Sequence, residues 1–395
     1  MKKIVKLLLT VILLFSFSLV RAEVTLESKQ AILYNLNDDT VLYDKNSSEK
    51  TYVASLTKIM TALVALENIS NLDNTVVVKY SDLQGLDGYA LAGFKVGDLV
   101  TYKDLLYGLM LPSGADSAMI LANNIAGSLD EFVKLMNEKV KSLGLKNTHF
   151  SNPIGMDLDN YSTASDMAII LKEALKYDMF ESLFSSDIYT TSNNLTLKKT
   201  TSKIALKYQL DIKNITGSKT GYTDLADYCL ASTATIDNVS YLAITLNAKN
   251  MPIHLEDTLA LYNYYSSHYS YKTILKKKQT LKTLKVKHSK IKEYKIYSTK
   301  KISKYLSNDI DVKDIEYKYT GVEELNRKIK KGDYLGKVEI VYNGEVLDIY
   351  KVYLEDDIKY YNYFYLLIPA GLIVIFFVII KNMNVTIQTL THKNE

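Results

Sequence analysis

Ser55 and Lys58 are the first pair of residues whose types and spacing could do chemistry. On a helix, residues three apart share a face, so the hydroxyl and the amine can come within hydrogen-bond reach. A neutral amine can take the hydroxyl proton and make serine a nucleophile. The alternative is an N-capping serine with a solvent-reaching lysine, and the same spacing recurs at Ser47 and Lys50.

The residues after Lys58 distinguish this pair from the others with the same spacing, because an apolar helix would bury this face. They include Ile59, Met60, Leu63 and Val64. A buried lysine is stabilised by losing its proton. We therefore expect a lowered pKa for Lys58.

Two further stretches could complete a site. Lys219-Thr220-Gly221 places a cation beside a hydroxyl and a glycine, which suits close approach by a carboxylate-bearing substrate, although an ordinary turn is the alternative. Ser113 stands in a predicted loop just before a helix, where an N-cap, at Ser113 or at Asp116, is the alternative.

The elements that must position these residues follow from periodicity. A hairpin is predicted near residues 31–43, and strands at 228–236 and 240–246. Helices are predicted at about 55–68, 102–111, 115–126, 130–143, 164–176 and 254–267. We expect an α+β fold, with an antiparallel sheet formed from both ends of the domain and helices on its faces.

Taken in chain order, the stretches at Ser55, Ser113 and Lys219 resemble the S-x-x-K, S-x-N and K-T-G motifs of penicillin-binding proteins and serine β-lactamases. With their flanks they look like the low-molecular-mass D-alanyl-D-alanine carboxypeptidases. The flanking stretches are 54–62, 111–114, 152–157, 161–164 and 219–223. The resemblance covers residues 23–268 well and implies a β-lactamase/transpeptidase-like fold.

That resemblance also implies roles. Ser55 would be the acylated nucleophile and Lys58 its general base, while Ser113 would pass a proton to the leaving group. Lys219 would supply positive charge and Thr220 would bind the substrate carboxylate beside Gly221. The backbone N–H groups of Ser55 and Tyr222 would form the oxyanion hole.

The chain departs from the motif at one position, because Ala115 stands where the family has asparagine. The amide that would hold Lys58 and the substrate is therefore missing. Either Asp116 or a water replaces that contact, or the site acylates poorly.

The two ends of the chain predict export and anchoring. Residues 1–22 combine lysines, an apolar run and a small residue, as in a signal peptide. Residues 363–380 carry no charge and would span about 27 Å. We expect a carboxypeptidase domain at 23–268, a small all-β domain at 269–360, a transmembrane helix at 361–381 and a cytoplasmic tail at 382–395. The catalytic domain would lie on the extracellular side of the cell membrane.

Composition excludes several classes. One cysteine excludes a disulfide framework, five scattered histidines give no ligand spacing, and we expect neither metal nor cofactor. Two arginines in an exported chain argue against nucleic acid. Between Lys272 and Lys304 stand 13 lysines and one acid, Glu293. This run is either a solvated face or a contact for anionic lipid or wall polymer.

The sequence favours a serine-type D-Ala-D-Ala carboxypeptidase that trims peptidoglycan stem peptides and is trapped by β-lactams. A catalytically inactive wall-binding homologue is the alternative that Ala115 motivates. A β-lactamase needs a second base, and neither Glu173 nor Glu181 sits in such a motif. A transpeptidase or endopeptidase on the same scaffold is a further alternative.

Overall fold

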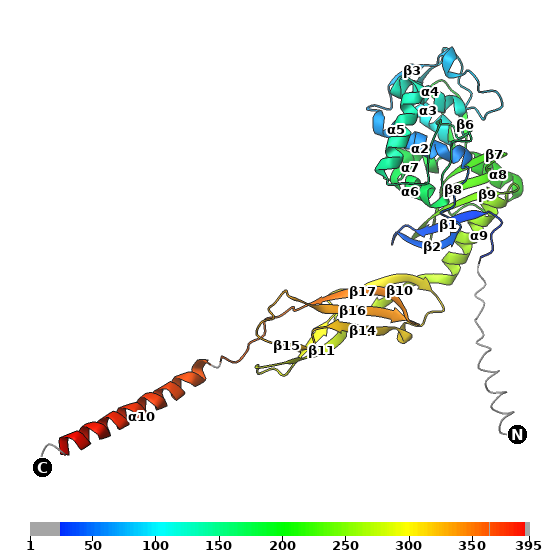
Figure 1. Ribbon diagram of the computed structural model, residues 1–395. Helices are drawn as coiled ribbons and strands as arrows, with labels where there is room; N and C mark the ends of the chain where they lie inside the picture. The colour runs from blue at the N-terminus through cyan, green and yellow to red at the C-terminus, as the bar shows by residue number, and fades with distance from the viewer. Residues whose placement is uncertain (1–23, 363, 392–395) are drawn as a thin grey trace, which may run out of the picture. The chain divides into compact units, whose positions relative to one another are not determined.

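The computed structural model describes residues 24–362 and 364–391. It divides into two compact units, the first ending at His268 and the second beginning at Tyr269 (Figure 1). Each unit has its own apolar core. The predicted signal peptide, residues 1–22, lies outside the described residues.

A five-stranded antiparallel sheet in the order β2-β1-β9-β8-β7 organises the first unit. Its strands come from both ends of the unit, as expected: β1 Gln30–Asn35, β2 Thr40–Lys45, β7 Ile215–Thr223, β8 Asp227–Ile236 and β9 Val239–Ala248. Leu230 of β8 packs on helix α9 (Ile253–His268), whereas its neighbour Ala231 joins the main helical core. Successive strand residues point to opposite faces, so both faces of the sheet are covered.

Helix α2 (Thr57–Asn68) lies at the centre of the helical layer. Its residues 57–65 are all buried, the polar Thr57, Lys58 and Thr61 among them. The surrounding helices are α3 Tyr102–Met110, α4 Ala115–Ala126, α5 Leu129–Ser142, α6 Ala164–Ala174 and α7 Asp178–Ser185, with α8 Thr200–Tyr208 against β7. The short strands are β3 Thr75–Val77, β4 Leu99–Thr101, β5 Ile188–Thr190 and β6 Thr196–Lys198, and the 3₁₀ turns are η1 Ala54–Leu56 and η2 Tyr80–Asp82.

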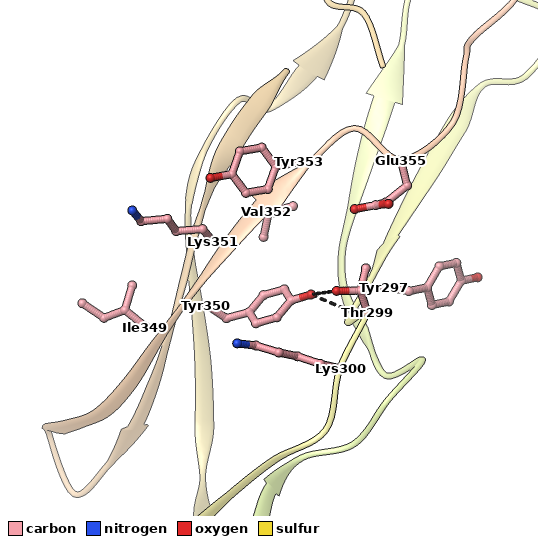
Figure 2. A pocket seen from close by; sticks show the side chains of 9 residues that line it. All are labelled: Tyr297, Thr299, Lys300, Ile349, Tyr350, Lys351, Val352, Tyr353 and Glu355. Carbon is pink, nitrogen blue, oxygen red and sulfur yellow. Dashed lines mark hydrogen bonds between the residues drawn. The ribbon is translucent and has the colours of Figure 1, made fainter. Parts of the chain in front are cut away.

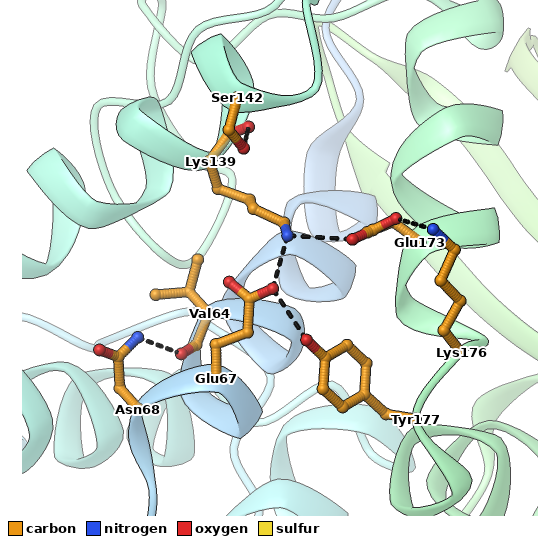
Figure 3. Close-up of polar contacts among 8 residues, drawn as sticks. All are labelled: Val64, Glu67, Asn68, Lys139, Ser142, Glu173, Lys176 and Tyr177. Carbon is orange, nitrogen blue, oxygen red and sulfur yellow. Dashed lines mark hydrogen bonds and ion pairs between the residues drawn. The ribbon is translucent and has the colours of Figure 1, made fainter.

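An ion-pair network ties the C-terminal end of α2 to its neighbours (Figure 3). The Lys139 ammonium on α5 lies 2.5 Å from a Glu67 oxygen on α2 and 3.1 Å from a Glu173 oxygen on α6. Glu173 also pairs with Lys176, and the Tyr177 hydroxyl donates to Glu67. The Lys139 side chain is 14% exposed, and its two ion pairs join three helices at the surface of the unit.

The second unit is built from strands packed around an apolar core. They are β10 Tyr269–Leu275, β11 Thr280–Val286, β12 Glu293–Tyr297, β13 Ile302–Ser307, β14 Glu316–Gly321, β15 Glu324–Leu325, β16 Tyr334–Tyr342 and β17 Glu345–Tyr353, with the 3₁₀ turn η3 Val312–Asp314. The sheets have the orders β10-β13, β12-β11-β15 and β14-β16-β17.

Helix α10 (Phe364–Thr391) follows the last strand and contains Pro369. In the part of the chain that the structure describes, no helix combines the length and the apolar character that crossing a membrane requires.

Candidate active site

Ser55 and Lys58 meet where the 3₁₀ turn η1 runs into α2. The Lys58 ammonium nitrogen lies 3.0 Å from the Ser55 hydroxyl oxygen, and Lys58 is only 1% exposed. Ser55 forms no side-chain cap, so the N-capping alternative is wrong. Burial lowers the Lys58 pKa from 10.5 to about 7, and the negative charge of Asp116 opposes the shift. A lysine with that pKa can serve as a base near neutral pH.

The loop at residues 152–155 supplies the second acceptor for Lys58, which donates to the Ile154 carbonyl at 3.1 Å. The Asn152 side chain accepts the backbone N–H groups of Ile154 and Gly155 and shapes the turn. Gly155 has φ +93°, and an added Cβ would lie 2.0 Å from the Ala54 carbonyl oxygen. Glycine is therefore needed for this loop to reach Lys58. From the sequence, this loop was noted only because residues 152–157 resemble the corresponding stretch of the carboxypeptidase family.

Ser113 and Lys219 form the second pair. The Lys219 ammonium donates to the Ser113 hydroxyl at 2.9 Å and to the Thr220 carbonyl at 2.7 Å. Ser113 has φ +66°, Gly114 occupies the N-cap position of α4, and no side chain caps that helix. The loop position of Ser113 was predicted correctly, and its hydroxyl contacts Lys219 instead of capping α4.

The Lys219-Thr220-Gly221 triplet lies inside β7, not in a turn before β8. β7 is the edge strand of the sheet, and a Cβ on Gly221 would lie 3.0 Å from the Ser55 backbone nitrogen. The close approach of β7 to η1 therefore brings Thr220 and Gly221 beside the serine, while Tyr222 on the same strand is half exposed.

The two buried lysines influence each other. Burial, and then the charge of Lys58, lower the Lys219 pKa well below its ordinary value. Two such cations in one buried site repel, so the charge on each amine disfavours protonation of the other. A carboxylate arriving beside Lys219 would favour its charged form, and Lys58 would then be the neutral base.

Ala115 is buried at the start of α4 and offers no polar side chain. Asp116 does not replace the missing asparagine by a hydrogen bond to Lys58, because its carboxylate accepts the backbone N–H groups of Ala92, Gly93 and Phe94. Its charge still acts on Lys58. Within the described residues, the Ile154 carbonyl is the group that holds Lys58 in addition to the serine.

The geometry agrees with comparisons to known proteins. Residues 18–250 match the family model described as D-alanyl-D-alanine carboxypeptidase. The chain belongs to this family. It is 32% identical to D-alanyl-D-alanine carboxypeptidase DacF of Bacillus subtilis over 344 residues, which is 86% of this chain and 87% of that protein.

Two other proteins are similar to this chain in sequence or in structure. A D-alanyl-D-alanine endopeptidase of Pseudomonas aeruginosa is 31% identical over 60% of this chain and 76% of its own length. The crystal structure of D-alanyl-D-alanine carboxypeptidase DacD from Francisella tularensis superposes with a TM-score of 0.71 at 21% identity, over 86% of this chain and 95% of that chain. That superposition shows the fold, which is an α+β penicillin-binding, transpeptidase-like architecture.

Proposed function

We propose that this protein is a serine-type D-Ala-D-Ala carboxypeptidase that removes the terminal D-alanine from peptidoglycan stem peptides. The observation that carries the proposal is the buried Lys58 amine, 3.0 Å from the Ser55 hydroxyl, with a pKa of about 7. Family membership supports the same reaction.

In acylation, Lys58 takes the Ser55 hydroxyl proton as the serine oxygen attacks the carbonyl between the two D-alanines. The oxyanion is held by the backbone N–H groups of Ser55 and Tyr222. Removing one such donor typically costs about 3–4 kcal/mol of transition-state stabilisation. The close contact of β7 with the Ser55 backbone supports this arrangement.

The leaving D-alanine nitrogen receives a proton through Ser113, which the Lys219 ammonium contacts at 2.9 Å. Lys219 and Thr220 bind the terminal carboxylate, a charge pairing that specifies the end of the peptide. A water then attacks the Ser55 ester, and a proton returns to the serine oxygen. β-Lactams acylate the same serine and block the site.

The test is release of D-alanine from a synthetic pentapeptide ending in D-Ala-D-Ala. The unaltered protein should release it, and Ser55→Ala should not. Product analysis on cross-linked muropeptides separates this activity from endopeptidase or transpeptidase action. Binding of the pentapeptide without release would favour the inactive wall-binding alternative and contradict the proposal.

A β-lactamase would require a second base beside the serine. Glu173 is held by Lys139 and Lys176, and Lys139 in turn contacts Glu67, nine residues along α2 from Lys58. Nine helical residues span about 13 Å, so the Glu173 carboxylate lies near the C-terminal end of α2, whereas Ser55 and Lys58 lie at its N-terminal end. Glu181 is exposed on α7. Slow turnover of nitrocefin is therefore expected.

We also propose that residues 1–22 direct export and that residues 361–381 anchor the chain in the cell membrane, with the catalytic unit outside and residues 382–395 in the cytoplasm. The support is the sequence pattern of the two ends. The lysine-rich run from Lys272 to Lys304 would add attraction to anionic lipid or wall polymer. Fractionation of cells and protease accessibility of the catalytic unit test this topology.

A further inference from the structure

A pocket of about 440 Å³ in the second unit carries aromatic and cationic side chains to which the catalytic site gives no role (Figure 2). It lies between β17 and the segment that follows β12. Among the described residues β17 is an edge strand that pairs with β16 alone, so one side of it is available to line a pocket.

Hydrogen bonds and an ion pair fix the floor of the pocket. The Tyr350 side chain is 6% exposed, and its hydroxyl accepts the Thr299 backbone N–H at 2.7 Å and lies 2.8 Å from the Thr299 hydroxyl. Lys304 on β13 pairs with Asp348 on β17 at 3.2 Å. These contacts hold β17 against its neighbours near the pocket.

The walls carry half-exposed aromatic rings. Tyr353 lies on β17 and Tyr297 ends β12, and Thr299 stands between the Tyr350 and Tyr297 rings (Figure 2). Tyr297 is 48% exposed and Tyr353 is 43% exposed. The Tyr353 ring packs edge-on against the ring of Tyr334, with 5.6 Å between the ring centroids, and Tyr334 is 53% exposed. Rigid rings with a polar edge bind partners at a small cost in conformational entropy.

The charge of the pocket favours an anion. Lys300 and Lys351 line it and form no ion pair among the described residues, and Glu355 is the one lining carboxylate. Residues 269–362 hold 22 Lys and Arg against 14 Asp and Glu, whereas residues 23–268 hold 20 against 29. The positive charge of the chain is therefore concentrated in the unit that bears the pocket.

We propose that this pocket binds the glycan strand of peptidoglycan, with sugar rings stacked on Tyr297 and Tyr353 and carboxylates of the attached stem peptides paired with Lys300 and Lys351. The lining of phenol, hydroxyl and ammonium groups suits an anionic sugar better than lipid chains. The choice of peptidoglycan over other anionic sugars rests on the proposed function, because that function requires the chain to work on this polymer.

The test is sedimentation of the full-length Ser55→Ala chain in detergent with purified peptidoglycan sacculi freed of teichoic acid. Replacing Tyr297 and Tyr353 together by alanine should weaken the apparent affinity about tenfold. Replacing Lys300 and Lys351 by glutamine should weaken it several-fold and reduce its sensitivity to salt.

The matched controls separate the pocket from folding and from bulk charge. Phenylalanine at both tyrosine positions should retain binding, because the rings remain. Lys313→Gln with Lys328→Gln removes the same charge at exposed sites outside the pocket and should leave binding near its original strength.

Equal sedimentation of the alanine and unaltered chains would overturn the proposal. So would an equal loss in the lysine controls, or a pocket-dependent affinity for phosphatidylglycerol vesicles without one for sacculi. Release of D-alanine from the soluble pentapeptide is measured separately in chains that retain Ser55. Loss of that activity alone would refute the catalytic proposal and leave the glycan site standing.

Discussion

The lowered pKa of Lys58 makes acylation of Ser55 depend on pH in a defined direction. The neutral amine is the base, and burial lowers its pKa from 10.5 to about 7. At pH 5 roughly one molecule in a hundred would carry that amine, and at pH 9 nearly all would. The second-order rate of acylation by benzylpenicillin should therefore rise about a hundredfold between pH 5 and pH 9, with its midpoint near 7.

The size of the shift shows what burial contributes. A difference of about 3.5 pKa units corresponds to roughly 5 kcal/mol between the protonation states. With an ordinary lysine pKa, only about one molecule in a thousand would hold a neutral amine near pH 7.5. The assay is stopped-flow or quenched labelling over this pH range, with circular dichroism at each pH to verify that the protein stays folded.

Lys199 provides a matched control. It is also buried, burial lowers its pKa to about 8, and its ammonium donates to the Phe184 carbonyl. Lys199→Met should leave the midpoint of the profile where it was, whatever it does to stability. A rate independent of pH between 5 and 9, or a midpoint that moves with Lys199, would refute the assignment of Lys58 as base.

Four further outcomes follow from the contacts of Lys58, Gly155 and Lys139. Lys58→Met should abolish acylation yet raise the free energy of unfolding at pH 7 by about 1–3 kcal/mol. The reason is that the lysine of the unfolded chain must give up a proton when it is buried, and methionine need not. A variant that urea melts show to be destabilised would contradict this. The same linkage makes the Lys58 contribution to stability rise as pH increases from about 7 to 10.5. Gly155→Ala should lose acylation and stability, because its Cβ would meet the Ala54 carbonyl. Gly127 has a similar positive φ but open space around it, so Gly127→Ala should lower the free energy of unfolding by only about 1 kcal/mol. Equal losses in the two variants would contradict the role given to the contact with Ala54. Lys139→Met should lower the unfolding free energy by about 1 kcal/mol and leave the acylation rate of folded protein within about twofold. A large rate loss without destabilisation would be evidence against a purely bracing network.

Much of the framework was readable from the sequence because strong periodicity encodes it. The helices at 102–110 and 115–126 and the strands β8 and β9 fall close to the predicted ranges. β7 was missed because glycine, serine and lysine interrupt its strand-forming threonines and tyrosine, so its Thr-Gly-Ser-Lys-Thr-Gly-Tyr core shows no alternation of apolar and polar residues. Pairing with β8 along its length supplies what local propensity lacks.

The site shows the same division. The Ser55–Lys58 pair follows from helical spacing and was predicted, as was the loop position of Ser113. The contact of Lys58 with the Ile154 carbonyl joins residues 96 positions apart, and no local pattern encodes such a contact. The consequence of Ala115 also required the structure, because only the orientation of Asp116 shows that its carboxylate is already bound to the 92–94 backbone.

The most direct test of the account is mass spectrometry of the intact protein after treatment with benzylpenicillin, followed by peptide mapping. We predict one stable penicilloyl adduct, located on Ser55 and absent from Ser55→Ala and Lys58→Met. An adduct at another residue, or no adduct on folded protein at pH 8, would contradict the central claim that Lys58 activates Ser55.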